Sequence, residues 1–97
     1  MKTINEIREI LREQKPFLRK RYKVSEIGMF GSYVRGEQNE MSDLDILVEF
    51  EEPVSLLDLA GLEIFLSDLL GIKVDVVPKR SIRPELKEII LREAVYL

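Results

Sequence analysis

Two aspartates at the start of a short apolar run are placed to hold a divalent metal ion. Asp43 and Asp45 lie in DLDILVEF, residues 43–50, whose alternating pattern predicts a strand. Side chains alternate along a strand, so both carboxylates project from one face, with Cα atoms about 7 Å apart. Carboxylates that close repel each other unless a cation lies between them. Because hard oxygen ligands suit Mg²⁺, the pair indicates a magnesium site.

A third aspartate interrupts a later apolar run. Asp75 lies in IKVDVV, residues 72–77, which also predicts a strand and ends before Pro78. A lone aspartate inside such a run is costly to bury without a partner. Two interpretations are open at this point. Asp75 lies on an exposed edge, or it lies beside Asp43 and Asp45 on the neighbouring strand and completes a carboxylate trio around a metal.

A Gly-Ser pair precedes the first two aspartates. Residues 24–30, VSEIGMF, predict a strand that ends at Gly31, and Ser32 then opens about one helical turn closed by Gly36. A serine at a helix start is ordinarily an N-cap. After a strand-end glycine, however, backbone N–H groups and a hydroxyl point into one opening, which suits an anionic phosphate.

These groups together indicate nucleotidyl or phosphoryl transfer with two metal ions. The chain has no histidine and no cysteine, so carboxylates, hydroxyls, amines or a metal must carry any chemistry near neutral pH. One metal would sit on a triphosphate, and the second would lower the pKa of the attacking hydroxyl. Ten residues separate Ser32 from Asp43, enough for one helical turn and a polar loop that returns the chain beside the turn.

The first helix of the chain has a clear start and an uncertain end. Thr3 and Glu6 fit a capping box, and apolar residues then recur at helical spacing. Pro16 predicts that the helix ends near Gln14 or restarts at the proline. The basic run KPFLRKRYK, residues 15–23, has two interpretations: a solvated helix face with two aromatic contacts to the core, or a contact to triphosphate or an acidic partner.

The second half predicts a strand–helix–strand crossover followed by a last helix. Ser55 and Asp58 form another capping-box pattern, and a helix from there to Leu70 stops at Gly71. The strands at 43–50 and 72–77 should therefore be parallel, with a right-handed connection. Pro84 opens the final helix at its first position. The candidate core residues are Leu56, Leu57, Ala60, Ile64 and Leu69 in the crossover helix, and Leu86, Ile89, Ile90 and Ala94 in the last one. The apolar tail 95–97 should pack on this domain or on a partner.

Composition sets limits on the class of protein. A chain of 97 residues predicts one domain, 1–97, with one core. The net charge of −3 argues against direct binding to nucleic acid, which needs a basic surface. No signal-like run or membrane-length apolar segment occurs in the sequence, so we expect an intracellular, cytoplasmic protein without a membrane partner.

The combination of motifs resembles a known family. The Gly-Ser pair, about ten residues, Asp-Leu-Asp and a later strand aspartate match the DNA-polymerase-β-like nucleotidyltransferase superfamily. The run from GSYVRG through SDLDILVEF, SLLDLAGLE and LLGIKVDVV to ILREAVYL is similar to its minimal nucleotidyltransferase branch, MNT. The resemblance covers essentially the whole chain, and it rests on the order and spacing of pieces that are individually common.

The resemblance implies a fold and a site. The fold is an α/β nucleotidyltransferase fold with a three-stranded mixed sheet, order 1-2-3, flanked by helices. Asp43 and Asp45 would be Mg²⁺ ligands, and Asp75 would be the third carboxylate on the side of the base. Gly31 and Ser32 would contact the triphosphate of ATP. Arg35, one turn later, either reaches the phosphates or is a surface arginine.

The resemblance also implies a partner and a reaction. Members of the branch resemble antitoxins that are encoded with a HEPN-domain ribonuclease toxin and transfer AMP from ATP to a tyrosine of that toxin. A non-catalytic antitoxin that neutralises its partner by forming a complex is the alternative. A nucleotidyltransferase for a small molecule such as an aminoglycoside is a third hypothesis, disfavoured because the chain has no room for a substrate-binding domain.

Overall fold

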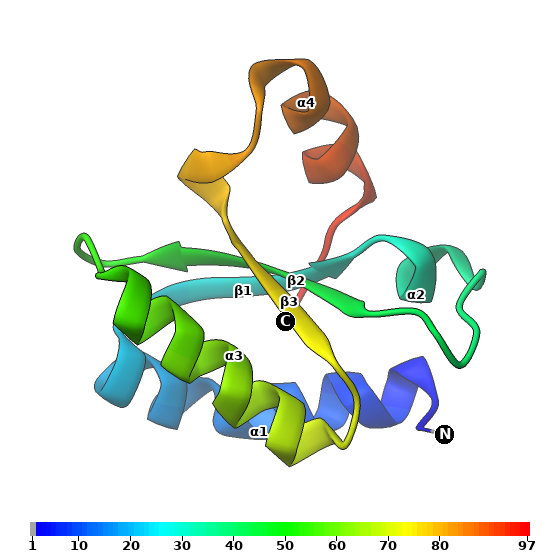
Figure 1. Ribbon diagram of the computed structural model, residues 1–97, viewed down its shortest axis with the longest axis horizontal. Helices are drawn as coiled ribbons and strands as arrows, with labels where there is room; N and C mark the ends of the chain where they lie inside the picture. Colours follow the sequence, from blue (N-terminus) through cyan, green and yellow to red (C-terminus); the bar gives the residue numbers. More distant parts are fainter. Residues whose placement is uncertain (1) are drawn as a thin grey trace.

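The computed structural model describes residues 2–97 as a sheet with helices on both faces. The elements in chain order are α1 (Ile4–Tyr22), β1 (Val24–Phe30), α2 (Ser32–Arg35), β2 (Leu44–Phe50), α3 (Leu56–Leu70), β3 (Val74–Pro78), the 3₁₀ turn η1 (Lys79–Ser81), α4 (Pro84–Glu93) and β4 (Val95–Tyr96). Helices α1 and α3 lie under one face of the sheet, and α4 lies over the other (Figure 1). No helix within residues 2–97 is both long and apolar enough to cross a membrane.

The sheet is mixed and has one strand more than the sequence predicts. Its order is β3-β2-β1-β4, so the expected order 1-2-3 is confirmed for the first three strands. The fourth is the apolar tail, because Val95 and Tyr96 pair antiparallel with Met29 and Gly28 of β1. The Leu97 amide then donates to the Ile27 carbonyl at 3.0 Å. A strand of two residues carries almost no periodic signal, which is why the sequence predicted packing but not pairing.

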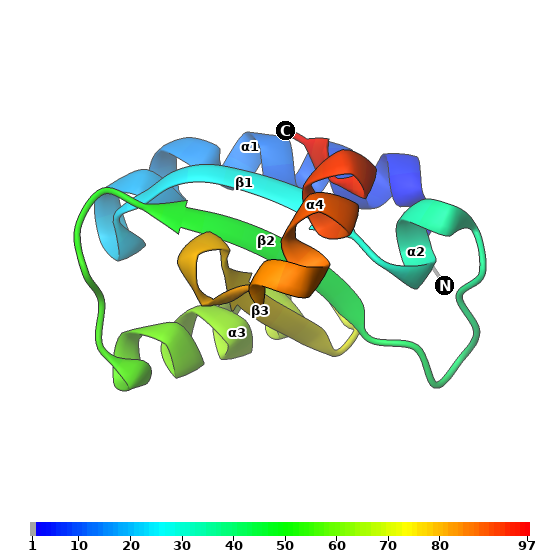
Figure 2. The ribbon, with the colours of Figure 1, turned by 90° about the horizontal axis from the view of Figure 1, so that it is seen from above.

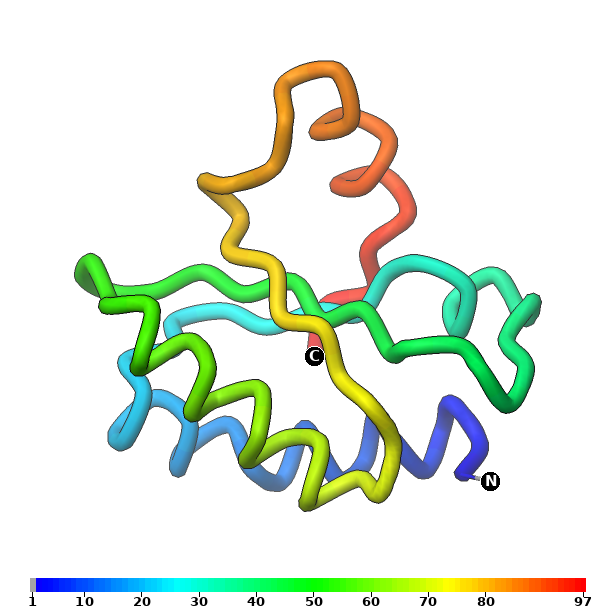
Figure 3. The backbone as a smooth tube through the Cα atoms, in the orientation of Figure 1, coloured from blue at the N-terminus to red at the C-terminus, as the bar shows by residue number. Residues whose placement is uncertain are grey.

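The crossover from β2 through α3 to β3 is confirmed, and Figure 3 shows its path along the backbone. Strands β1 and β2 are antiparallel, whereas β2 and β3 are parallel. The capping box of Ser55 and Asp58 forms as expected, and Gly71 ends α3 in the left-handed conformation with φ of 69°. These signals fix where the crossover helix begins and ends, and hence how β3 returns beside β2.

Helix α1 is continuous, so the predicted break at Pro16 is wrong. The Thr3–Glu6 capping box is present, and Pro16 lies inside the helix on its exposed side. Leu11 and Leu18, seven residues apart on one helix face, are both 0% exposed. Burial on both sides of the proline keeps the two halves in register and offsets the lost backbone hydrogen bond.

The basic run at 15–23 lies along this helix, and its aromatic residues pack on α3. The rings of Phe17 and Tyr22 lie 5.1 and 5.9 Å from that of Phe65, measured between centroids. Arg19 pairs with Glu51 at 3.1 Å. These contacts agree with the interpretation of a solvated face with two aromatic contacts.

The predicted core face of α3 is largely wrong. The buried residues are Leu62, Leu66 and Leu70, spaced four apart, whereas Leu56 and Leu57 are each 84% exposed. Ala60 and Ile64 are exposed as well, and of the predicted set Leu69 is partly buried against the core. The helix is apolar around most of its circumference, so its sequence does not single out one face.

Helix α4 begins with Pro84 in its first turn, as predicted, and covers the other face of the sheet (Figure 2). Ile90, Leu91 and Ala94 pack on a small cluster formed by Phe30, Leu47 and Ile82. The prediction that Leu86 and Ile89 face inward is wrong, because these side chains are exposed. The helix touches the sheet through its C-terminal half, which carries the end of α4 toward the β1–α2 turn.

Candidate active site

The aspartates of β2 and β3 are neighbours across the sheet. Asp45 and Asp75 are register partners in the parallel pair, so their Cα atoms are about 4.8 Å apart, the usual strand separation. Leu44 and Ile46 belong to the main core, and Leu47 packs under α4. Period-two alternation therefore puts Asp45 on the α4 face, and its register partner Asp75 lies on the same face. Both interpretations of Asp75 hold in part: it is exposed on the edge strand β3, and it lies beside Asp45 of the neighbouring strand.

Asp43 lies one residue before β2 begins, two residues from Asp45 along the chain. It is partly buried, whereas Asp75 is exposed. The Lys73 ammonium lies 3.9 Å from an Asp43 oxygen, so one cation already approaches this carboxylate. The backbone thus brings all three predicted carboxylates to one end of the β2–β3 pair.

The pKa of Asp45 is affected by the neighbouring carboxylates. Partial burial, followed by the charges of Asp75 and Asp43, raises the pKa of Asp45 to about 6. Arg35 opposes the rise, and Glu93 adds to it. A carboxyl with a pKa raised by burial and by like charges is typical of functional sites.

The carboxylates have the right chemistry for magnesium, but their oxygens do not converge on one point. Within residues 2–97, no three histidine, cysteine, aspartate or glutamate side chains are grouped closely enough to hold one metal ion. The pKa of Asp45 is raised first by partial burial and then by the charges of Asp75 and Asp43, and a bound cation would offset both effects. The chemistry of the donor set therefore suits Mg²⁺, whereas the side-chain arrangement observed among the described residues does not form a metal site.

The Gly31 turn lies against the Asp45 carboxylate. Gly31 has φ of 83° and ψ of −157°, and it is the N-cap of α2. A Cβ atom on Gly31 would lie 2.1 Å from Asp45 Oδ2, so a side chain here would collide with the aspartate. Ser32 is the first helical residue rather than the cap. The turn therefore needs glycine for its backbone conformation and for its close approach to Asp45.

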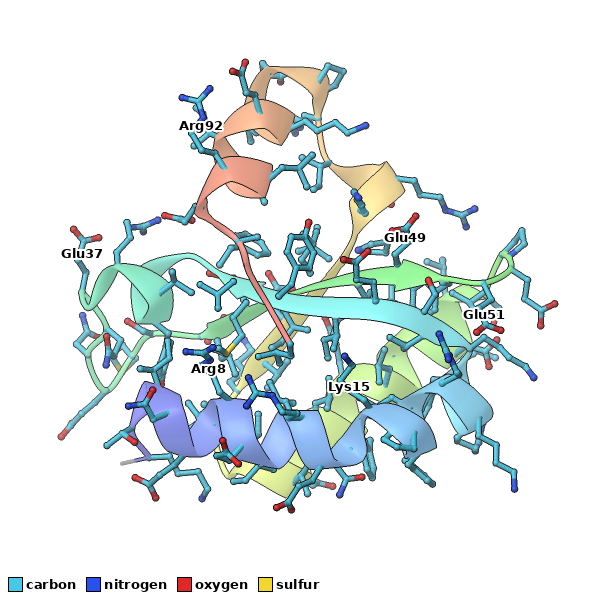
Figure 4. The ribbon with its side chains drawn as sticks, turned by 180° about the vertical axis from the view of Figure 1, so that it is seen from behind. Arg8, Lys15, Glu37, Glu49, Glu51 and Arg92 are labelled. Atoms are coloured by element: carbon cyan, nitrogen blue, oxygen red, sulfur yellow. The ribbon has the colours of Figure 1, made fainter. Side chains whose placement is uncertain are left out.

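Arg35, the last residue of α2, is held by two carboxylates. Its Nε donates to Glu37 at 2.6 Å, and its Nη1 donates to Glu93 at 2.7 Å. The hydrogen bonds that the guanidinium donates to Glu37 and then to Glu93 raise its pKa above the ordinary value. Figure 4 shows Glu37 at the α2 end of the molecule, away from Glu49 and Glu51 at the far end of β2.

Glu93 is a site residue that the sequence analysis did not identify. Besides Arg35, its carboxylate accepts a hydrogen bond from the Gly31 amide at 2.8 Å. Partial burial opposes ionisation, but the hydrogen bonds from Arg35 and Gly31 lower the pKa of Glu93. The residue lies in ILREAVYL, a segment that carries the family resemblance, yet it is 62 positions away from Gly31 in the sequence. No local pattern marks such a long-range contact.

Comparison with known proteins identifies the family. A model of the nucleotidyltransferase domain family matches residues 5–97. Protein adenylyltransferase MntA of Thermococcus cleftensis is 53% identical over 97 residues, covering 100% of this chain and 98% of the relative.

Two solved structures are similar in fold. A chain provisionally described as a minimal nucleotidyltransferase superposes with a TM-score of 0.82 at 44% identity, covering 99% of this chain and 97% of that one. A chain from a complex described as a tri-AMPylated Shewanella oneidensis HEPN toxin with MNT antitoxin has a TM-score of 0.62 at 26% identity, covering 95% of this chain and 66% of that one. The predicted resemblance is thus confirmed, and the chain belongs to the nucleotidyltransferase family, among the minimal nucleotidyltransferases whose relatives include protein adenylyltransferases.

Proposed function

We propose that this protein transfers AMP from ATP to a tyrosine hydroxyl of a HEPN ribonuclease toxin and thereby acts as its antitoxin. The observation that carries the proposal is the register pairing of Asp45 with Asp75 beside the Gly31 turn. The relative named as a protein adenylyltransferase and the complex of a tri-AMPylated HEPN toxin with an MNT antitoxin support the reaction and the partner.

Each residue of the site has a role in this proposal. Asp43 and Asp45 would hold two Mg²⁺ ions with Asp75, and these ions would supply charge neutralisation at the phosphates and a more acidic hydroxyl. Gly31 and Ser32 contact the triphosphate, and Arg35 contributes guanidinium donors toward it. The tyrosine oxygen attacks the α-phosphorus of ATP, the bond to the β-phosphate breaks, and pyrophosphate leaves. Asp75, the most exposed of the three carboxylates, would be on the side of the base that receives the hydroxyl proton.

The carboxylates also account for why the site needs a cation. Without one, ionising Asp45 is opposed by the charges of Asp75 and Asp43. The triphosphate would add further negative charge to the same region, which makes binding of free ATP unfavourable. We therefore expect nucleotide binding and transfer to require Mg²⁺, with little binding of metal-free ATP.

The test mixes the purified protein, its cognate HEPN toxin, ATP and Mg²⁺, and measures the mass of the toxin. The expected result is a toxin that gains AMP, with pyrophosphate released in equal amount. Asp45→Asn should abolish the gain without unfolding the domain. Asp68→Asn is the matched control, because it removes the same charge from the exposed side of α3. Normal transfer by Asp45→Asn would refute the assignment of the site.

The same variants separate the rival hypotheses. If Asp45→Asn protects cells from the toxin as well as the wild type does, the protein is a binding module that acts by complex formation. If the wild type adenylylates a small hydroxyl compound without any protein partner, it is a small-molecule nucleotidyltransferase.

A further inference from the structure

Glu93 joins two parts of the site that are distant in sequence. One carboxylate oxygen, Oε2, accepts from the Gly31 amide at 2.8 Å, and the other, Oε1, accepts from Arg35 Nη1 at 2.7 Å. The Glu93 side chain is 20% exposed, whereas those of Arg35 and Glu37 are 48% and 64% exposed. This bridge is therefore better protected from water than the neighbouring Arg35–Glu37 pair.

The bridge is anchored on a packed element. Glu93 is the last residue of α4, and the turn of the helix that precedes it packs on the sheet through Ile90 and Leu91. Ala94 directly after it packs on the same cluster. The carboxylate is thus presented from a fixed point, and it restrains two groups on a short, one-turn helix.

Gly31 is the site residue with the greatest need for such a restraint. Glycine has more backbone freedom than any other residue, and the conformation observed here has φ of +83°. A freely rotating Gly31 would have to be ordered each time a triphosphate bound. A hydrogen bond from its amide to a packed helix carries part of that ordering cost in advance.

We propose that Glu93 is a positioning residue for the nucleotide. By accepting the single N–H of Gly31 it fixes the backbone of the Gly31–Ser32 turn, and by accepting from Arg35 it fixes the guanidinium, in the geometry that receives the triphosphate. The inference rests on the proposed function, because it assigns the Gly31–Ser32 turn and Arg35 to phosphate binding. Only two of the five N–H donors of the guanidinium are engaged by Glu37 and Glu93, so donors remain for a phosphate while the bridge stays in place.

A competing role for Glu93 predicts the opposite change in nucleotide affinity when the residue is removed. If the Glu93 carboxylate occupied the phosphate position and had to be displaced, its removal would tighten nucleotide binding. Removing a negative charge near a triphosphate also favours binding by charge alone. Weaker binding after loss of Glu93 would therefore support positioning against both of these effects.

Two variants test the length and the charge of the Glu93 side chain separately. Glu93→Gln keeps the length of the side chain but cannot accept from both donors. Glu93→Asp keeps the charge but is too short to span them from the same backbone position. Both should raise the Kd for AMP-PNP with Mg²⁺ about tenfold, the factor expected for the loss of one charge-assisted hydrogen bond. Glu88→Gln is the matched control, because Glu88 pairs with Arg92 and both side chains are exposed on the same helix. Figure 4 shows Arg92 projecting outward from α4.

The experiment combines calorimetric titration with AMP-PNP and Mg²⁺ and an NMR measurement of the Gly31 amide. We expect a tenfold weaker Kd and a shifted, faster-exchanging Gly31 amide in both Glu93 variants, with neither change in Glu88→Gln. A shifted amide with unchanged or tighter binding would overturn the positioning role and leave the proposed function intact. A wild type that binds no nucleotide would refute the proposed function and with it the role in nucleotide binding. The amide would then still report whether the bridge exists.

Discussion

Replacing Asp45 with asparagine should stabilise the metal-free protein at neutral pH, and it should stabilise the protein less at acidic pH. The pKa of Asp45 rises from its ordinary value of 3.8 to about 6 in the folded state because of partial burial and the charges of Asp75 and Asp43. Between those values the native state binds more protons than the unfolded state, so stability falls as the pH rises from about 4 to 6. The penalty is complete above the folded pKa, and asparagine removes it.

The magnitude follows from the same two pKa values. The folded-state pKa lies about 2 above the ordinary value. Each difference of one in pKa corresponds to about 1.4 kcal/mol, so the cost to the free energy of unfolding is roughly 3 kcal/mol. Asp45 is only partly buried, so solvent screening reduces the expected gain to about 1–2 kcal/mol at pH 7.5. In a domain of this length, each kcal/mol of added stability raises Tm by about 4–8 °C.

The assay is urea unfolding of the wild type and of Asp45→Asn at pH 4 and pH 7.5, in low salt and with a chelator. The difference between the two proteins should be about 1–2 kcal/mol larger at pH 7.5 than at pH 4. Adding Mg²⁺ at pH 7.5 should stabilise the wild type and leave the variant unchanged. The control Asp68→Asn should show neither effect. An Asp45→Asn variant that is less stable at pH 7.5, or equally altered at both pH values, would refute the inferred repulsion.

Three further predictions test the fold around the site. Gly31→Ala should cost about 2–4 kcal/mol in urea unfolding, because its Cβ would lie 2.1 Å from a carboxylate oxygen of the β2 aspartate. Gly36→Ala, with a similar φ but open space, should cost about 1 kcal/mol, and equal losses would contradict the steric argument. Pro16→Ala should raise stability by about 1–3 kcal/mol by restoring a helical hydrogen bond, and a loss would mean that the helix depends on the proline. Leu62→Ala should cost about 2–5 kcal/mol in thermal unfolding, whereas the exposed Leu57→Ala should change stability by less than about 0.5 kcal/mol. Similar values for the two leucines would show that the buried face of α3 has been misidentified.

The features predicted correctly from the sequence are those that local chemistry determines. Capping boxes at Thr3 and Ser55 mark helix starts because the bonds involved span three residues. The alternation in residues 43–50 fixes which side of β2 carries Asp45, and the crossover length makes β2 and β3 parallel. These rules place the two aspartates on adjacent parallel strands, whereas the register that makes Asp45 and Asp75 direct partners comes from the structure.

The features predicted wrongly depend on packing between distant segments. The break at Pro16 followed from a local rule, and the buried residues on either side of the proline outweigh that rule. The inward face of α3 depends on where the sheet lies, because an apolar helix offers several stripes of similar hydrophobicity. The pairing of Val95 and Tyr96 with β1 is a contact across most of the chain.

Glu93 shows that the same limit applies within the candidate active site. A carboxylate at the end of a helix has no distinctive sequence context, and its function depends on the position of Gly31 and Arg35 in another part of the chain. Sequence reasoning identifies groups whose chemistry is unusual at their own position, such as an aspartate in an apolar strand. It overlooks groups that are ordinary at their own position and matter only through a distant partner. Because the bridge connects α4 to the Gly31 turn, a change in the packing of α4 would reach this turn without any contact to the aspartates.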